Sequence, residues 1–167
     1  TVVLKPSEQT PLTALRLVQL AADIFPAGVL NLVFGRGPTV GSPLVNHPKV
    51  RMVSLTGSIA TGANIISSTA DSVKRMHMEL GGKAPVIIFN DADIDAAVEG
   101  IRTFGFYNAG QDCTAACRIY AQADIYDAFV EKLGAAVASI KYGLQDDPAT
   151  ELGPLITAQH RDRVAGF

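Results

Sequence analysis

The sequence has little of several features that would assign it to a specialised class of protein. It contains only two cysteines, Cys113 and Cys117, in 167 residues. Two cysteines are too few for a disulfide framework, and no second pair of ligands accompanies them to complete a structural zinc site. A reducing compartment fits this cysteine usage best.

Concentrated charge and long apolar runs are missing as well. The formal net charge is −2, and the basic residues are scattered rather than gathered into a surface for nucleic acid or anionic lipid. No apolar stretch approaches the roughly 18 residues that cross a bilayer, and the first residues lack the basic and apolar regions of a signal peptide. We therefore expect a cytoplasmic protein with a small-molecule partner, no nucleic acid and no membrane.

What is present is the composition of a globular protein. Hydrophobic residues make up 48% of the chain, which suits one compact domain or parts of two. The chain opens without methionine in a strand-like run at residues 1–4, and it stops inside a helical pattern at residues 164–167. We expect it to be an excerpt, so that part of any active site would lie outside it.

Apolar runs alternate with amphipathic stretches along residues 1–80. Strands are expected at residues 2–4, 30–34 and 50–55, and helices at residues 11–25, from about 38 and at 58–70. Thr10 and Pro11 mark the start of the first helix. Because the strand-like runs are short, rich in β-branched residues and separated by helices, they predict a parallel sheet, with ligands bound at the carboxyl ends of its strands.

The pattern changes at the glycine pair Gly81-Gly82, which follows a strand ending in Glu79 and Leu80. Beyond it we expect strands at residues 85–89 and 118–122, helices at 93–106 and 124–140, and a loop at 108–116. We place a domain boundary here: residues 1–80 would hold a cofactor, and residues 81–167 would carry a nucleophile.

Two glycine-containing segments follow predicted strands. GRGPTVG (residues 35–41) resembles a dinucleotide fingerprint with its spacing wrong by one residue, and a turn leading into a proline-started helix is the alternative. TGSIATG (residues 56–62) has the spacing of a triphosphate loop, but Ala63 and Asn64 replace the lysine and hydroxyl residue of that loop. A phosphate-binding turn and an ordinary turn both remain open for this segment.

The sequence predicts no metal site. Asp91, Asp93 and Asp95 imitate the start of a calcium loop, but Ala96 and Arg102 stand where that loop needs glycine and glutamate. Helix capping explains these acids better. The three histidines have neither the spacing of a metal site nor a link to a cysteine, and we interpret them as structural or surface residues: His47, His77 and His160.

Two residues are candidates for chemistry. Cys113 lies in a predicted loop of small and polar residues, whereas an inert cysteine is more often on an apolar face. Cys117, next to a predicted strand, fits that inert description better. Glu79 ends an apolar strand with glycines directly behind it, a placement that suits a carboxylate for proton transfer.

Taken together, these segments resemble the aldehyde dehydrogenase superfamily along essentially the whole chain. The family's motifs occur in order: KPSE (5–8), GRGPTVG (35–41), TGS (56–58) with Gly62, ELGGK (79–83) and GQDC (110–113). The resemblance implies an α/β fold, with a Rossmann-like parallel-sheet NAD-binding part followed by the start of the α/β catalytic domain. It also implies a homo-oligomeric parent, a dimer or a tetramer.

The resemblance also implies roles for individual residues in binding NAD. Lys5 and Glu8 of the Lys5-Pro6-Ser7-Glu8 motif would bind the adenosine ribose, and Ser58 would bind the pyrophosphate. Thr56, Gly57 and the Leu80 carbonyl would border the nicotinamide. A carboxylate at Glu8 accepts hydrogen bonds from a free ribose 2′-hydroxyl and repels the 2′-phosphate of NADP, so NAD is the expected cofactor.

By the same resemblance, the Cys113 thiolate attacks the aldehyde carbon and Glu79 activates the water that hydrolyses the resulting thioester. The string around Cys113 is most similar to the bacterial γ-aminobutyraldehyde dehydrogenases of putrescine breakdown. That similarity implies an ω-aminoaldehyde as the aldehyde substrate, with Tyr107 and Asp112 as candidate substrate residues; betaine aldehyde is an alternative.

Two elements of the family are expected outside the excerpt: the asparagine of the oxyanion hole before Thr1 and a glutamate-phenylalanine motif after Phe167. The excerpt alone is therefore expected to be inactive. The rival interpretations are a cysteine acyl-transfer enzyme without a redox cofactor and a noncatalytic nucleotide-binding fragment, which differ from a dehydrogenase in whether a histidine stands beside Cys113 and whether Cys113 is reactive.

Overall fold

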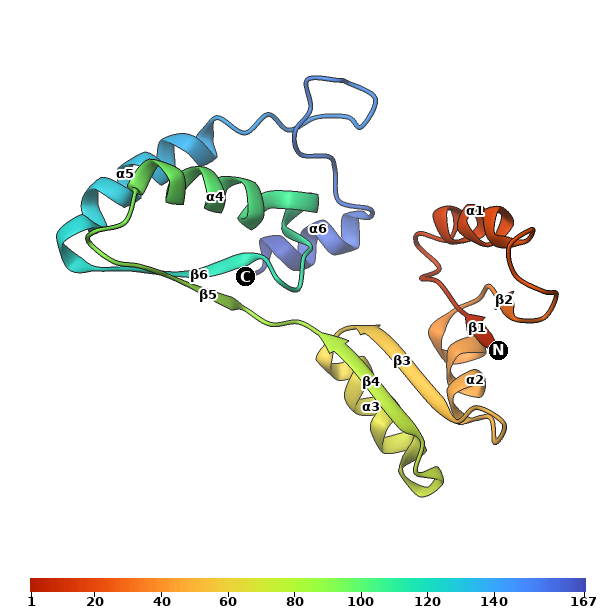
Figure 1. Cartoon of the computed structure of the whole chain (residues 1–167). Coiled ribbons are helices and arrows are strands. Elements are labelled where there is room, and N and C mark those ends of the chain that lie inside the picture. The colour runs from red at the N-terminus through yellow and green to blue at the C-terminus, as the bar shows by residue number, and fades with distance from the viewer. The chain divides into compact units, whose positions relative to one another are not determined.

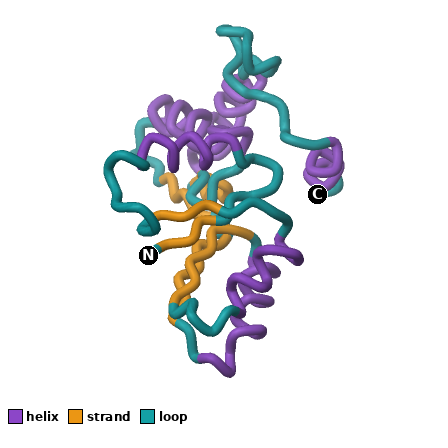
Figure 2. Tube along the Cα trace, turned by 90° about the vertical axis from the view of Figure 1, so that its right-hand side faces the viewer, coloured by secondary structure: helices purple, strands orange, loops and turns teal.

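The structure, a computed structural model, describes all 167 residues. The chain divides into two compact units, Thr1–Leu80 and Gly81–Phe167. Strands and helices alternate along both units, as can be followed in Figure 1 by residue number and in Figure 2, where helices are purple and strands are orange. No helix is both long and apolar enough to cross a membrane.

The first unit contains two parallel strand pairs and the helices that connect them. Its strands are β1 (Val2–Leu4), β2 (Leu30–Leu32), β3 (Met52–Gly57) and β4 (Arg75–Leu80). Its helices are α1 (Leu12–Ala21), a π-helical turn η1 (Gly37–Gly41), α2 (Ser42–Asn46), α3 (Ile59–Thr69) and a 3₁₀ turn η2 (Ala70–Ser72). β1 pairs with β2 and β3 pairs with β4, each in parallel. The predicted parallel connections are therefore confirmed.

The predicted strands of this unit do not all join into one ladder. β2 and β3 follow each other in the chain but share no hydrogen-bonded register. Strands that are consecutive in sequence are neighbours in a sheet only about two-thirds of the time, because a crossover can pass over a position. β2 is also shorter than predicted: it ends at Leu32, and the chain leaves it before Phe34.

Helix boundaries show where local chemistry decided the outcome. Ser58 caps α3, because its side chain accepts a hydrogen bond from the Thr61 amide. The predicted cap at Thr10 is wrong: its amide closes a turn onto the Ser7 carbonyl, and α1 begins after Pro11 without a side-chain cap. α1 also ends at Ala21, four residues early, where the chain continues as single turns.

The second unit is a parallel strand pair covered by helices. It consists of β5 (Ala84–Ile88), α4 (Ile94–Phe106), a 3₁₀ segment η3 (Tyr107–Gly110), β6 (Ala116–Ala121), α5 (Ala123–Ala138) and α6 (Ala158–Ala165). In Figure 1, α4 and α5 lie side by side over the β5–β6 pair. The Asp93 side chain caps α4 by accepting from the Ala96 amide, as predicted for this acid.

The core of the second unit fixes how the helices lie on the strands. Its buried members come from one strand and both helices: Ile88, Val98, Ile101, Ile125 and Phe129. Burial of each such side chain stabilises the fold by about 1.5–3 kcal/mol. This packing holds α4 against the strand pair. From the end of α4 the chain passes through η3 into the segment that carries Cys113.

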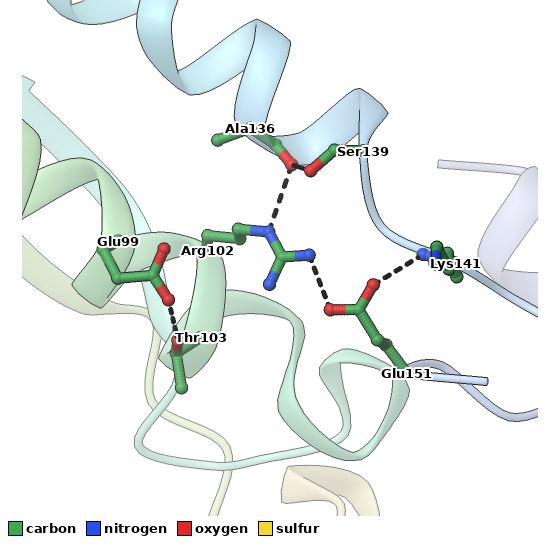
Figure 3. Close-up of polar contacts among 7 residues, drawn as sticks. All are labelled: Glu99, Arg102, Thr103, Ala136, Ser139, Lys141 and Glu151. Carbon is green, nitrogen blue, oxygen red and sulfur yellow. Dashed lines mark hydrogen bonds and ion pairs between the residues drawn. The ribbon is translucent and has the colours of Figure 1, made fainter. Parts of the chain in front are cut away.

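Beyond α5, a polar network ties the following segment back to both helices (Figure 3). The Arg102 guanidinium on α4 donates one hydrogen bond to the Ala136 carbonyl of α5 and a second to the Glu151 carboxylate, over 3.2 Å and 2.6 Å. The other Glu151 oxygen accepts from the Lys141 amide at 3.0 Å. Both bonds keep the pKa of Glu151 below its usual value, with the Lys141 amide as the larger cause.

Candidate active site

Cys113 lies in a tight turn between η3 and β6. The Ala115 amide donates to the Asp112 carbonyl across this turn, and Ala115 itself is buried, so the turn is anchored by its apolar residue. The thiol side of the turn is open, because Cys113 is exposed. The turn therefore leaves the Cys113 side chain exposed while its hydrogen bond holds the backbone in place.

The Asp112 carboxylate braces the same turn. One of its oxygens accepts hydrogen bonds from both the amide and the hydroxyl of Thr114, each at 2.9 Å. These bonds lower the pKa of Asp112, the Thr114 amide contributing most, the Thr114 hydroxyl next and the Cys113 side chain least, against a partial opposing effect of desolvation. Asp112 therefore braces the turn that carries Cys113.

The backbone just before this turn is strained. Asn108 and Ala109 have φ values of 52° and 58°, a left-handed conformation that costs free energy for residues with a Cβ, and Gly110 follows at 72°. Reciprocal bonds hold the segment: the Asn108 side chain donates to the Gln111 carbonyl, and the Gln111 side chain and amide donate to the Asn108 carbonyl. Tyr107, the tentative substrate residue, begins this segment with an exposed ring.

The entry to β5 fits closely against the nucleophile turn. A Cβ placed on Gly82 would lie 2.9 Å from the carbonyl oxygen of Cys113, closer than real Cβ contacts. Lys83 has a left-handed φ of 67°, and its carbonyl accepts a hydrogen bond from the Arg118 guanidinium at 3.0 Å. The β5–β6 register shifts between Ala84 and Pro85, which leaves Cys117 as the extra residue of a bulge. Gly82, the second glycine of ELGGK, therefore leaves the space that the turn carrying Cys113 occupies.

The residues predicted to bind a cofactor lie at strand ends of the first unit. Thr56 and Gly57 end β3, and Ser58 begins α3, where amides at a helix start favour an anion. In the parallel register, Thr56 is opposite Glu79 and Gly57 is opposite Leu80. The structure thus brings the predicted nicotinamide and pyrophosphate residues to the same end of one strand pair as the predicted base.

A second group forms where β1 ends. The Lys5 ammonium donates to the carbonyls of Pro6 and Gly35, at 2.8 Å and 2.9 Å, and lies 3.8 Å from a Glu8 carboxylate oxygen. The Ser7 hydroxyl accepts from the Gln9 amide and shapes the turn between them. A donor beside an acceptor matches the two vicinal hydroxyls of a ribose. The residues present therefore fit the adenosine end of a dinucleotide.

The GRGPTVG segment adopts the second of the two structures considered for it. Pro38 stands in the first turn of the π-helical turn η1, which leads directly into α2. Gly35 has a positive φ of 148°. Gly41 lies against the Lys5 side chain, since a Cβ there would be 3.4 Å from Lys5 Cε. This proline-started helix supports the Lys5 position.

Sequence reasoning missed one polar residue of the site, His77. We interpreted it as a structural or surface histidine, but its ring Nε2 lies 3.1 Å from a Glu79 carboxylate oxygen. The signal was present in the spacing: residues i and i+2 of a strand lie on the same face. His77 and Glu79 have this spacing on β4.

Comparison with known proteins gives the family. The sequence matches the aldehyde dehydrogenase family over residues 1–167, and the chain belongs to that family. It is 45% identical to betaine aldehyde dehydrogenase 2 of Rhizobium meliloti over 166 residues, which are 99% of this chain and 34% of that protein. It is 48% identical to a probable NADP⁺ succinate-semialdehyde dehydrogenase of Sinorhizobium fredii, with 98% and 34% covered.

The fold is likewise that of the family's solved structures. The crystal structure of betaine aldehyde dehydrogenase from Staphylococcus aureus in complex with NAD⁺ has a TM-score of 0.94 and 42% sequence identity, and the match covers 99% of this chain and 33% of that one. The predicted α/β aldehyde dehydrogenase fold is therefore confirmed. The chain spans about a third of the length of the relatives it matches.

Proposed function

We propose that the whole protein to which this chain belongs oxidises an aldehyde to a carboxylic acid with NAD, with Cys113 as nucleophile and Glu79 as general base. The observation that carries the proposal is the exposed Cys113 on a turn braced by Asp112 and fitted against Gly82, within a chain of the aldehyde dehydrogenase family.

The residues of the chain account for the covalent steps. The thiolate sulfur of Cys113 bonds to the aldehyde carbon. The Cys113 amide would donate a hydrogen bond to the oxyanion that forms. After oxidation, the acyl group is held as a thioester on the same sulfur. Glu79 takes a proton from water, whose oxygen attacks the thioester carbon, and the carboxylic acid leaves as the Cys113 thiolate is restored.

The cofactor residues fit NAD by their chemistry. When bound, NAD supplies the acceptor for the two electrons and the hydrogen removed from the aldehyde carbon. Lys5 and Glu8 would hold the adenosine ribose hydroxyls, and the start of α3 with Ser58 would hold the pyrophosphate. Thr56, Gly57 and Leu80 would border the nicotinamide. Their support is the donor and acceptor pair at the end of β1 and the capped helix start after β3.

The proposed substrate is an ω-aminoaldehyde, with γ-aminobutyraldehyde, which would give 4-aminobutanoate, as the first candidate. Its support is the ionised Asp112 next to the nucleophile, since its hydrogen bonds lower the pKa of that carboxyl, and the exposed ring of Tyr107 nearby in sequence. Both features favour a cation. Betaine aldehyde, also a cation, is the second candidate, because a relative named for it is 45% identical.

The test is NADH formation by the full-length protein with a panel of cationic, neutral and anionic aldehydes. We expect turnover with wild type and none with Cys113→Ala, while Cys117→Ala, four residues later on β6, serves as the matched control and remains active. Turnover that survives in Cys113→Ala would remove Cys113 from the mechanism.

A further inference from the structure

One face of the β3–β4 pair is polar and open. Along both strands, alternate residues point to opposite faces. One face packs on α3, as the contact between Gly62 and the Leu80 side chain shows, and Val53 is buried there. The opposite face carries the exposed residues of both strands: Met52, Ser54, Thr56, Arg75, His77 and Glu79.

Three of these residues lie in one polar row: Ser54, His77 and Glu79. Ser54 lies directly opposite His77 in the parallel register, and its hydroxyl shares a hydrogen bond of 2.9 Å with His77 Nδ1. His77 Nε2 lies 3.1 Å from Glu79 Oε1, two residues further along β4. Nδ1 is therefore hydrogen-bonded to the serine, and Nε2 lies within ion-pair distance of the carboxylate, where it can take a proton from Glu79 once that group is protonated.

We propose that His77 is a positioning residue for Glu79 that also accepts the proton Glu79 removes from water. This inference rests on the proposed function of Glu79. When the water oxygen attacks the thioester carbon, its proton passes to the Glu79 carboxylate and then to His77 Nε2, while Nδ1–H donates to the Ser54 hydroxyl. The result is an imidazolium paired with a restored carboxylate, and the imidazolium then releases its proton to water.

The surroundings of the ring suit this transfer. Within this chain the side chains of His77 and Glu79 are 54% and 56% exposed. The other charged group on the open face is Arg75, also on β4, and β3 contributes only the hydroxyls of Ser54 and Thr56 besides Met52. No second carboxylate on this face competes with Glu79 for the imidazole.

The arrangement differs from an ordinary surface ion pair in its directionality. Exposed pairs contribute little to stability because their side chains are free to separate. Here the Ser54 hydroxyl holds Nδ1 of the His77 ring. Glu79, on the other side of the ring, is the last polar residue before Gly81 and Gly82. Histidine is also the side chain that changes charge between about pH 5 and 8, so its role leaves a signature in a pH profile.

The experiment measures decay of the Cys113 thioester in the full-length protein. Limiting γ-aminobutyraldehyde or betaine aldehyde is mixed with enzyme and excess NAD, and the acyl adduct on Cys113 is followed by rapid quench and mass spectrometry from pH 5 to 9. The variants are His77→Gln, whose amide can form hydrogen bonds but does not titrate, and His77→Ala, which can do neither. His47→Gln is the matched control, since the His47 ring accepts from the Lys49 amide and lies outside β3 and β4.

We expect wild type and His47→Gln to share one pH profile, with a rise in decay rate between about pH 5 and 8. In His77→Gln this rise should disappear and the decay rate at pH 7.5 should fall about tenfold or more, and His77→Ala should be slower still because Glu79 also loses its support. Formation of the thioester should be little changed in all variants.

Two results would overturn the assignment. A His77→Gln protein with the wild-type rate and profile leaves His77 outside the mechanism, and one that is slower with an unchanged profile reduces His77 to a structural residue. Both results leave the proposed function intact, since a thioester still forms and decays. If wild type forms no thioester on Cys113 with any aldehyde of the panel, the proposed function fails and the His77 role falls with it.

Discussion

Gly82 and Cys113 meet at a point where no side chain fits between them: a Cβ on Gly82 would lie 2.9 Å from the Cys113 carbonyl oxygen. The atom opposed to that Cβ belongs to the backbone, so a larger residue cannot be accommodated by turning a side chain aside. The position of the nucleophile is therefore set by the strand entry after Glu79 as well as by its own turn.

Gly82→Ala is expected to displace the turn that carries Cys113. A displacement of about 1 Å at a nucleophile can lower the rate as much as 10²-fold, so we expect kcat of the full-length enzyme to fall about 10- to 100-fold. The KM for NAD should stay near wild type. Gly100→Ala is the control, because a Cβ at Gly100 on α4 meets nothing within 4 Å. Equal kcat values for the two variants would contradict this account.

The sequence predicted those features that local chemistry determines. Ser58 and Asp93 were expected at helix starts, and both cap their helices because a hydroxyl or carboxylate there satisfies an unpaired amide. Thr10 is of a suitable type as well, yet Pro11 takes the N-cap position of α1 and no side chain caps the helix. A residue type alone does not reveal at which residue a helix begins.

Other features depend on contacts between segments far apart in the chain. The left-handed backbone at Lys83 and the bulge at Cys117 lie where β5 and β6 meet, so residue preferences alone could not predict them. The contact of His77 with Glu79 required knowing that both lie on one strand, with Ser54 opposite. In the candidate site, the placement of Cys113 in a loop and of Glu79 at a strand end was predictable, and the residues that contact them were not.

The choice between NAD and NADP is expected to depend on Glu8. Its carboxylate lies 3.8 Å from the Lys5 ammonium, and it would repel a 2′-phosphate on the ribose held there. In the full-length enzyme, Glu8→Gln should raise kcat/KM for NADP relative to NAD by about tenfold. Glu131→Gln on α5 serves as the control. An unchanged ratio in Glu8→Gln would show that other residues decide between the two cofactors.

The stability contributed by the Arg102–Glu151 pair is expected to depend on pH. The Lys141 amide and the Arg102 guanidinium lower the pKa of Glu151 in the folded state. A carboxyl with a depressed folded pKa adds stability that is present above its unfolded pKa of about 4.3, and that stability is lost as pH falls through the lower folded value.

Glu151→Gln should therefore lower the melting temperature of the full-length protein at pH 7 and at pH 5, and the difference from wild type should vanish at the acid end, below the folded pKa. Arg102 is shared between Glu151 and the Ala136 carbonyl, so Arg102→Gln should destabilise at every pH. Thermal unfolding scans from pH 3 to 8 measure both effects. A Glu151→Gln difference that grows toward low pH would have the wrong sign for this pair.

The substrate prediction depends on the charge of Asp112. Asn at this position keeps an oxygen that can accept from the Thr114 amide, so Asp112→Asn removes the charge while preserving the main brace of the turn. We expect the KM for γ-aminobutyraldehyde to rise about two- to tenfold, while the KM for butanal, a neutral aldehyde of similar length, changes little. Because the carboxylate is partly open to water, the difference between the two substrates should shrink as salt concentration increases.

Asp146→Asn, a loss of the same charge in the segment after α5, is the control and should leave both KM values unchanged. Equal increases for both aldehydes in Asp112→Asn would show that Asp112 only braces the turn, and would leave the aminoaldehyde assignment without its physical support.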